Sequence, residues 1–309
     1  MSHSLPAAEI FKAYDIRGIV DKTLTPSAVT AIGHALGSEA LTRGQKSIAV
    51  GRDGRLSGNR LAGALSEGIR SAGVDVIDIG CVPTPLAYFA AYQLGTGSCV
   101  SVTGSHNPPD YNGLKMVLGE ETLFGDGIQA LRRRIADDDL AHGGGAYSTA
   151  DVVQPYIERV VGDVQLSRPM KIVMDCGNGV AGAVAPDLFR RLGCELDELF
   201  CDVDGNFPNH HPDPSKPENL EDLIKALRET DAELGIAFDG DGDRLGVVTK
   251  DGEIIYPDRQ LMLFAEDVLT RVPGGEIIYD VKCTRNLAGW IHARGGTATM
   301  WNTGHALIK

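Results

Sequence analysis

The residues best suited to chemistry in this chain lie in two short segments. One is TGSHNP at residues 103–108, where Ser105 presents a small nucleophilic hydroxyl on a turn that follows a glycine. The other is DGDGDR at residues 239–244, whose aspartates alternate with glycines. A serine oxygen can carry a phosphoryl group, and closely spaced carboxylates attract a divalent cation. Together the segments predict one site, in which the serine carries phosphate and the cation holds it.

Ser105 follows a Val-Ser-Val segment at residues 100–102 that is typical of a strand, and the prolines after Ser105 stop the strand from continuing. We therefore expect the hydroxyl to be exposed at a strand end, where α/β sheets place their ligands. His106 is adjacent, but neighbouring side chains in an extended segment point to opposite sides, so we expect no Ser–His base pair. The chain has no Gly-x-Ser-x-Gly motif, which leaves a hydrolase triad without support. A serine in a simple proline turn is the alternative interpretation.

The aspartates of the second segment follow an apolar run at residues 234–238 that is typical of a strand. Alternating glycines allow the loop to curl until its carboxylates face one hard cation, and without a cation or an arginine such close charges repel one another. An EF-hand does not fit, because Arg244 holds its sixth position and Lys250 its twelfth. Magnesium suits the cluster best, since it accepts a few carboxylates and leaves room for a phosphate oxygen. An acidic solvated turn is the alternative.

Basic groups must balance the phosphates, and several occur in polar turns. The candidates are Arg17, Lys115, Arg244, Arg259, Lys282 and His305. Each alone is more typical of a solvated surface charge, whereas Arg52 and Arg55 could equally form structural pairs with Asp53. The stretch NHHPDP at residues 209–214 holds two histidines without a spaced third ligand, which favours a rigid interdomain loop over a zinc site.

The elements that must position these residues follow an internal repeat. Each unit has a β-rich run that ends in Asp and a polar turn, then a helix that stops at glycine, then another strand. The units occupy residues 47–79, 171–200 and 276–301. We predict an α/β protein built from repeated αβα-type domains with mixed sheets, two of them complete and a third partial. One long doubly wound sheet is the alternative.

Composition shifts divide the chain further. Residues 136–150 are acidic and then glycine-rich, which is typical of a linker, and a turn at residues 250–252 follows a predicted strand. We predict a first domain over residues 1–150 with the serine loop, a second over 151–251 with the aspartates, and a third over 252–309. The third is shorter than either predecessor, so we expect the chain to end within a domain.

The overall composition is that of a globular enzyme, with 309 residues, 43% hydrophobic and 23% charged. A net charge of −13 argues against binding to nucleic acids and anionic membranes, and it requires local cations for any anionic substrate. The six cysteines form no CxxC pair, which is typical of reduced core thiols in a cytosolic protein. The chain shows neither a signal peptide pattern nor an apolar run near the ~20 residues of a membrane helix, so we expect a cytoplasmic location.

Several motifs resemble those of the α-D-phosphohexomutases, and the resemblance covers essentially the whole chain in order. The defining motifs are TGSHNP, DGDGDR and KAYDIRG at residues 12–18. Three longer strings are most similar to the bacterial phosphomannomutase/phosphoglucomutase branch of that superfamily. They are TGSHNPPDYNGLK at residues 103–115, NHHPDPSKPENL at residues 209–220 and NTGHALIK at residues 302–309.

The resemblance implies an intramolecular phosphotransferase that interconverts hexose 6-phosphate and hexose 1-phosphate through a phosphoserine. A sugar 1,6-bisphosphate would turn over in the site, with Mg²⁺ as cofactor and glucose 1,6-bisphosphate as activator or intermediate. The implied metal ligands are Ser105, Asp239, Asp241 and Asp243. The residues implied at the transferring phosphoryl group are Ser105, Arg17, Lys115 and His106. Those implied on the sugar side are Tyr14, Arg17, Arg244, Lys282 and His305.

The family has four domains, of which three share the repeated topology and a fourth binds the distal phosphate of the substrate. This chain stops at Lys309, without the sugar-binding loop of the third domain and without the fourth domain. We therefore expect a fragment with impaired turnover. A non-catalytic fragment that binds magnesium and phosphosugars is the alternative, and a phosphatase that loses its phosphoryl group to water is a third. Mannose and glucose both stay open as the hexose, and so does the oligomeric state.

Overall fold

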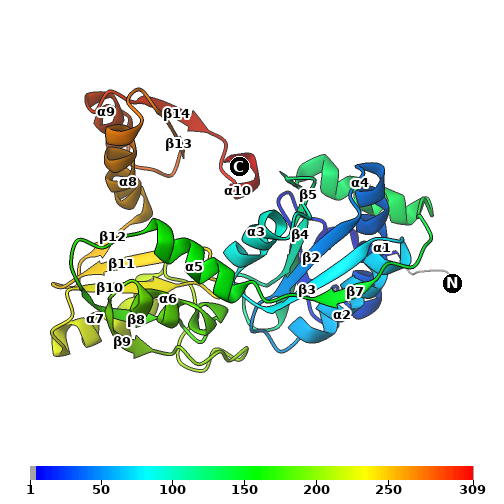
Figure 1. Ribbon diagram of the computed structural model, residues 1–309, viewed down its shortest axis with the longest axis horizontal. Coiled ribbons are helices and arrows are strands. Elements are labelled where there is room, and N and C mark those ends of the chain that lie inside the picture. The colour runs from blue at the N-terminus through cyan, green and yellow to red at the C-terminus, as the bar shows by residue number, and fades with distance from the viewer. Residues whose placement is uncertain (1–4, 309) are drawn as a thin grey trace.

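The computed structural model describes residues 5–308, and their strands form three sheets of seven, five and two strands. The sheets follow one another along the chain, each with its own helices (Figure 1). In that view the first unit lies beside the second, and the third stands over the second. The chain then returns toward the first unit through α10 (His305–Ile308). The three units therefore surround a common central region.

The first sheet is mixed and has the strand order β1-β5-β4-β2-β3-β7, with β6 paired to β5. Strands β2, β3 and β4 are parallel to one another, whereas β5 runs antiparallel to both β1 and β4. Its strands are β1 (Ile16–Ile19), β2 (Ser47–Arg52), β3 (Asp75–Cys81), β4 (Cys99–Val102), β5 (Tyr111–Leu118), β6 (Glu121–Thr122) and β7 (Tyr147–Thr149). The parallel strands end on one edge of the sheet, where the serine loop follows β4.

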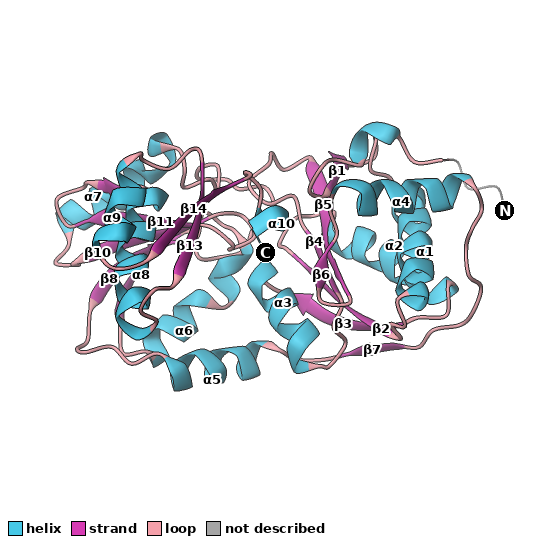
Figure 2. Cartoon of the chain, turned by 90° about the horizontal axis from the view of Figure 1, so that it is seen from above, coloured by secondary structure: helices cyan, strands magenta, loops and turns pink. Residues whose placement is uncertain are grey.

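Helices cover both faces of this sheet (Figure 2). They are η1 (Ala8–Ile10), α1 (Pro26–Thr42), α2 (Gly58–Ser71), α3 (Thr84–Gln93) and α4 (Gly125–Ala136). α1, α2 and α4 bury an apolar core on one face, and α3 covers the other. α1 and α2 pack so closely that a Cβ at Gly68 would lie 2.1 Å from the carbonyl oxygen of Thr30. This αβα layering matches the sequence prediction.

The segment predicted as a linker packs against the first unit instead of leading away from it. Strand β7 within it pairs with β3 in parallel, with Tyr147 opposite Val76. Its glycines have a packing role, because a Cβ at Gly145 would lie 1.9 Å from the carbonyl oxygen of Val74. The glycines that resemble a flexible linker in the sequence therefore allow two backbones to lie side by side.

The second sheet is also mixed, with the order β12-β11-β10-β8-β9. Its strands are β8 (Lys171–Asp175), β9 (Glu195–Leu199), β10 (Leu234–Phe238), β11 (Leu245–Thr249) and β12 (Ile254–Ile255). The helices beside it are α5 (Val153–Asp163), η2 (Val180–Ala183), α6 (Ala185–Arg191), η3 (Pro217–Leu220) and α7 (Glu221–Glu229). Because the turn at residues 250–252 joins β11 to its antiparallel partner β12, this sheet continues beyond residue 251. The exact domain boundaries stay predictions.

The third unit holds a small parallel sheet of two strands. Its elements are α8 (Pro257–Arg271), β13 (Glu276–Asp280), α9 (Asn286–Ala293) and β14 (Thr297–Trp301). Its core is formed by α8, α9 and β13, with residues such as Leu269, Leu287 and Ile277. The parallel pairs β2–β3, β8–β9 and β13–β14 each span one predicted repeat, so the repeated α/β fold is confirmed.

The structure also bears on two expectations from the composition, which concern membrane helices and cysteines. Between residues 5 and 308, no helix combines the length and the apolar character needed to cross a membrane. All six cysteines are free thiols, but they are not all in the core, because Cys81 is exposed.

Candidate active site

The serine loop after β4 and the aspartate loop after β10 meet at the boundary between the first two units. Ser105 Oγ donates a hydrogen bond of 3.3 Å to Asp239 Oδ2. The backbones also touch, since a Cβ at Gly240 would lie 2.4 Å from the carbonyl oxygen of Ser105. The spatial convergence that the sequence required of these two loops is therefore present.

Ser105 is buried, with only 2% of its surface exposed, which corrects the expectation of an exposed hydroxyl. The aspartate loop covers it, and that loop comes from a part of the chain whose proximity no local pattern reveals. Ser105 also has φ of +51°, a left-handed conformation that a non-glycine residue adopts at a cost of about 1–3 kcal/mol. Such a conformation persists only where surrounding contacts hold it. Its own amide donates to Thr103 Oγ1 over 2.7 Å.

The expectation that Ser105 and His106 do not pair is wrong. Ser105 Oγ lies 3.2 Å from His106 Nδ1. The argument assumed an extended segment, whereas the left-handed turn at Ser105 brings both side chains to the same side. Desolvation, followed by the charge of Arg244, lowers the pKa of His106 to about 4. The imidazole is consequently neutral near pH 7. Its Nδ1 can donate to Ser105 Oγ while the hydroxyl donates to Asp239, or accept the single hydroxyl proton when that proton turns away from Asp239.

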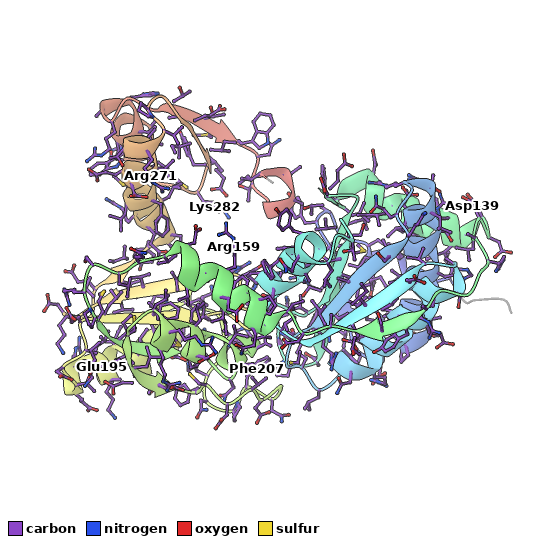
Figure 3. The ribbon with its side chains drawn as sticks, in the orientation of Figure 1. Asp139, Arg159, Glu195, Phe207, Arg271 and Lys282 are labelled. Carbon is purple, nitrogen blue, oxygen red and sulfur yellow. The ribbon has the colours of Figure 1, made fainter. Side chains whose placement is uncertain are left out.

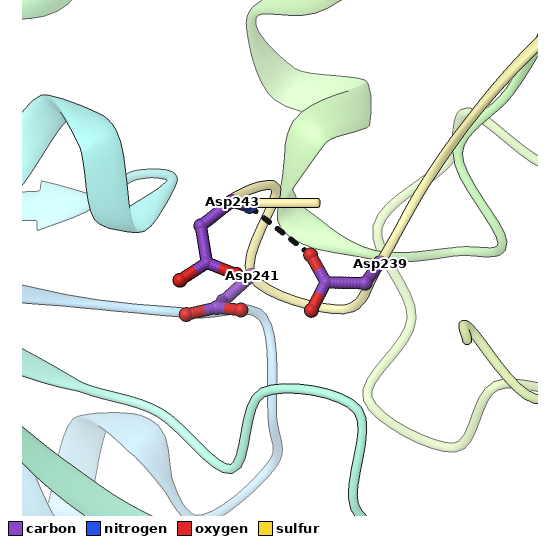
Figure 4. A group of neighbouring side chains, drawn as sticks. All are labelled: Asp239, Asp241 and Asp243. Atoms are coloured by element: carbon purple, nitrogen blue, oxygen red, sulfur yellow. Dashed lines mark hydrogen bonds between the residues drawn. The ribbon is translucent and has the colours of Figure 1, made fainter. Parts of the chain in front are cut away.

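The three aspartates converge in space (Figure 4). One carboxylate oxygen from each of Asp239, Asp241 and Asp243 lies within 4.8 Å of the others. Asp239 Oδ1 accepts hydrogen bonds from the amides of Asp243 at 3.0 Å and Arg244 at 3.1 Å, and these fix the curl of the loop. Asp241 Oδ1 is buried and has no hydrogen-bond partner among the described residues. A buried oxygen left open beside two further carboxylates fits a hard divalent cation.

The electrostatics of the cluster agree with that fit. Burial and then the neighbouring carboxylates of Asp241 and Asp243 raise the pKa of Asp239 well above its usual range. Burial also works to raise the pKa of Asp241, but the charge and hydrogen bond of Lys115, together with the hydrogen bond from Thr84, outweigh burial and hold that pKa below its usual value. The carboxylates of the cluster repel one another, and Lys115 offsets only part of that repulsion. A divalent cation would offset the rest.

Lys115 provides the positive charge inside the cluster. Its Nζ lies 2.6 Å from Asp241 Oδ2 and 2.6 Å from Asp243 Oδ2. Desolvation works to lower the pKa of Lys115, but these two carboxylates raise it above its usual value. Lys115 is buried and lies within β5, and not in a polar turn as the sequence suggested.

Arg17 also lies in a strand, β1, directly opposite Gly113 of β5. Since Gly113 and Lys115 are two positions apart on β5, Arg17 and Lys115 project from the same face of the sheet. Arg17 pairs with Asp15, while its Nε is buried without a hydrogen-bond partner among the described residues. This Nε is a free hydrogen-bond donor that could bind an anion at the serine.

Thr84, at the first turn of α3, is a site residue that the sequence analysis missed. Its Oγ1 donates to Asp241 Oδ2 over 2.5 Å, and its amide donates to the carbonyl oxygen of Asp241 over 2.9 Å. A proline stands on either side of Thr84, and such prolines indicate the start of a helix. No local sequence pattern predicts that Thr84 contacts Asp241. Thr84 therefore locks the aspartate loop onto the first unit.

The loop at residues 209–214 bridges the first two units, as predicted. His211 Nε2 contacts the carbonyl oxygen of His106, and His210 Nε2 lies 2.9 Å from Asp175 Oδ2. Neither histidine belongs to a three-ligand group, since the aspartates form the metal-compatible cluster found in residues 5–308.

The residues assigned to the sugar side lie where the third unit faces the first two. Tyr14 Oη donates to the carbonyl oxygen of Thr303 over 3.0 Å, which joins the first unit to the third. Lys282 is 71% exposed, pairs with Asp280 at 3.3 Å, and lies on the side of the third unit that faces the other two (Figure 3). It lines a cavity of about 660 Å³ with Arg259 and Tyr256. Arg244 is exposed beside the aspartates. The side chain of His305 lies outside what the structure describes.

Comparisons with known proteins agree with this geometry. Residues 8–141 match the family described as phosphoglucomutase/phosphomannomutase, alpha/beta/alpha domain I, and residues 154–252 match its domain II. The phosphomannomutase/phosphoglucomutase of Pseudomonas aeruginosa is 57% identical over 306 residues, which are 99% of this chain and 66% of that protein. The phosphoglucomutase of Neisseria meningitidis is 57% identical over 305 residues, 98% of this chain and 66% of that protein.

A solved structure shares the fold throughout. The phosphoglucomutase/phosphomannomutase family protein of Burkholderia thailandensis has a TM-score of 0.95 and 61% identity, covering 98% of this chain and 68% of that one. The chain thus spans about two thirds of the length of these relatives. The shared domains, the sequence identity and the superposed fold give one answer: the chain belongs to the phosphoglucomutase/phosphomannomutase family.

Proposed function

We propose that this chain carries the phosphoserine centre of a phosphohexomutase, which interconverts hexose 6-phosphate and hexose 1-phosphate of mannose, glucose or both. The observation that carries the proposal is the 3.3 Å contact of Ser105 Oγ with Asp239, in a cluster whose Asp241 holds an unpartnered buried oxygen. A nucleophilic oxygen and a cation site therefore come from different units and meet at one point. The names of the relatives, which cover both mannose and glucose, support the substrate class.

Ser105 Oγ would carry the phosphoryl group in the resting enzyme. In the first transfer, the bond from phosphorus to Ser105 Oγ breaks as a bond to a hydroxyl oxygen of the sugar phosphate forms, giving a 1,6-bisphosphate. The sugar hydroxyl loses its proton, and Ser105 Oγ takes up a proton to become a hydroxyl. In the second, the bond from phosphorus to the other phosphorylated sugar oxygen breaks as a bond to Ser105 Oγ forms. The neutral His106, 3.2 Å away, is placed to accept the proton of the Ser105 hydroxyl, and the sugar oxygen that is released takes up a proton to become a hydroxyl. Glucose 1,6-bisphosphate would serve as intermediate and activator.

The charges around Ser105 suit this transfer. Mg²⁺ bound by Asp239, Asp241, Asp243 and a phosphate oxygen on Ser105 would neutralise charge on the phosphoryl group. Lys115 would add a fixed positive charge at the same point, and Arg17 would supply a guanidinium from the adjacent strand. Tyr14, Arg17, Arg244, Lys282 and His305 would bind the sugar phosphate from the side of the third unit.

Isotope-labelled glucose 1,6-bisphosphate tests the proposal directly. With Mg²⁺, label from the phosphoryl group should appear on Ser105 of the wild type and be lost in Ser105→Ala. Ser148→Ala, an exposed serine of β7, is the matched control and should label like the wild type. An unlabelled wild type, or undiminished label on Ser105→Ala, contradicts the role of Ser105. Calorimetry with Mg²⁺ and glucose 1-phosphate beside a mutase assay separates a mutase from a chain that only binds phosphosugars.

A further inference from the structure

Arg55, in the loop after β2, forms hydrogen bonds to the backbone of the serine loop. Its guanidinium is fully buried, with no exposed side-chain surface. It donates hydrogen bonds of 2.5–2.9 Å to four carbonyl oxygens, those of Ser105, Asn107, Pro108 and Tyr111. A single side chain thus fixes the whole turn that presents the Ser105 hydroxyl.

Asp53 completes this arrangement from the other end of the loop. Its Oδ2 accepts hydrogen bonds from Thr103 Oγ1 at 2.7 Å and from the Gly104 amide at 3.1 Å, and it pairs with Arg55 Nε at 3.2 Å. Thr103 Oγ1 in turn accepts from the amide of Ser105. The carboxylate therefore holds the residues before the serine, and the guanidinium holds those after it.

The side chain of Arg55 packs tightly against the serine loop. A Cβ at Gly104 would lie 2.4 Å from Arg55 Cζ, so the guanidinium packs directly on the loop backbone. The ring of Phe207, from the second unit, lies with its centroid 5.2 Å from Arg55 Cζ. Arg55 consequently touches both the loop that carries the nucleophile and the unit that carries the aspartates.

This geometry needs arginine in particular. A guanidinium is a planar fork with five donors, whereas a lysine ammonium is a compact charge with three. Only the fork can meet four carbonyls and a carboxylate at once. The left-handed turn of Ser105 is the conformation that these contacts stabilise, and that turn directs Oγ toward Asp239 and His106.

We propose that Arg55, paired with Asp53, is a positioning residue for phosphoryl transfer, which holds the Ser105 oxygen in line with the aspartate cluster. The inference rests on the proposed function of Ser105. Arg55 does not touch the reacting atoms; it acts through the loop backbone. Misplacement of a reacting atom by about 1 Å can slow a reaction by about 10²-fold, so a loosened loop should affect the rate and leave donor binding in place.

The test is the rate of Ser105 labelling by isotope-labelled glucose 1,6-bisphosphate in a single turnover with Mg²⁺, measured on Arg55→Lys. The rate at saturating donor should fall by about 10²-fold. The donor concentration for half-maximal rate should stay within about threefold. Arg52→Lys is the matched control. Among the described residues, the Arg52 side chain pairs with Asp78 at 3.2 Å and forms no hydrogen bond with the serine loop, so this variant should label at the wild-type rate. A purely structural role would lower the unfolding midpoint of Arg55→Lys and leave the saturating rate unchanged, which would overturn the proposal.

Two further measurements keep the outcome decisive. Amide hydrogen exchange over residues 103–111 should accelerate in Arg55→Lys and stay unchanged over α1. If the wild type takes no label, the proposed function fails, while exchange still decides whether Arg55 holds the loop. If Arg55→Lys does not fold, Thr103→Val, which removes one hydroxyl from the same network, should slow labelling by about tenfold at saturating donor. Wild-type labelling of Thr103→Val would then overturn the inference.

Discussion

The boundary between the first and second units differs sharply from the contact between the first and third. Across the former, Lys115 and Thr84 bind Asp241 through buried polar contacts of 2.5–2.6 Å. Across the latter, a hydrogen bond joins Tyr14 to the carbonyl oxygen of Thr303, and it is exposed to solvent. One boundary is closed and charged, and the other is open to water.

The difference matches the two demands of the proposed reaction. Transfer of a phosphoryl group needs fixed charges and a fixed nucleophile, which the first boundary supplies before any substrate arrives. A bisphosphate that turns over within the site needs room, which the open side next to Lys282 and its cavity of about 660 Å³ supplies. Rigid chemistry and adjustable sugar binding are thus assigned to different boundaries of one molecule.

Removing the charge at the first boundary should have the largest effect. Lys115→Met leaves the carboxylates of Asp241 and Asp243 without their counter-ion, and it should slow Ser105 labelling at saturating donor by about 10²–10³-fold. The matched change at the open side, Lys282→Met, should mainly raise the donor concentration required, because Lys282 is exposed and free to adapt. Single-turnover labelling across donor concentrations measures both. Equal losses of saturating rate in the two variants would remove the distinction between the boundaries.

Forcing the two loops apart should have the next largest effect. In Gly240→Ala, the new Cβ would meet the carbonyl oxygen of Ser105 at 2.4 Å, and backbone on both sides prevents easy relief. We expect about 10²-fold slower labelling and about 1–3 kcal/mol lower unfolding free energy. Gly289→Ala in α9 of the third unit is the control, because nothing lies within 4 Å of its Cβ position. That variant should gain about 0.4–1 kcal/mol in urea unfolding. A stable, fully active Gly240→Ala would show that the loops separate freely.

The same contrast explains how far the sequence could predict this molecule. The strand–turn–helix repeats and the aspartate cluster were readable, because apolar runs, glycine stops and alternating carboxylates are local signals. The burial of Ser105 was not readable, since the loop that covers it comes from another unit. Lys115 was assigned to a turn because Asn and Gly precede it. Gly113 instead lets two strands approach, as a Cβ there would lie 2.3 Å from the carbonyl oxygen of Ile16.

Arg55 is a second case in which the sequence predicted a local pair and could not predict the contacts between distant segments. The sequence placed Arg55 beside Asp53 and suggested a structural pair, which is present. Its contacts with the serine loop depend on packing between β2 and β4, which no spacing in the chain encodes. Local patterns therefore predicted which chemistry is present, whereas the conformation that makes Ser105 and His106 partners depends on contacts far apart in the sequence.

A smaller effect, on stability, should come from the histidine loop at the closed boundary. Burial works to lower the pKa of His210, but the hydrogen bond and charge of Asp175 outweigh it and raise that pKa above its usual value. Asp222 adds to this field, and the Phe200 ring packs against the imidazole. Because the folded-state pKa exceeds the unfolded value of 6.5, the pair contributes stability that is fully present below that pH and is lost as the pH rises through the folded-state pKa.

Urea unfolding of the wild type and His210→Asn from about pH 5.5 to about pH 9 checks this dependence. The difference in unfolding free energy between them should be largest at the acidic end and shrink as the pH rises. His292→Gln, an exposed histidine of α9, should follow the wild type at every pH. A gap that widens with rising pH would mean that His210 is held neutral in the folded state. The loop at residues 209–214 would then keep its place at the closed boundary without an ion pair to Asp175.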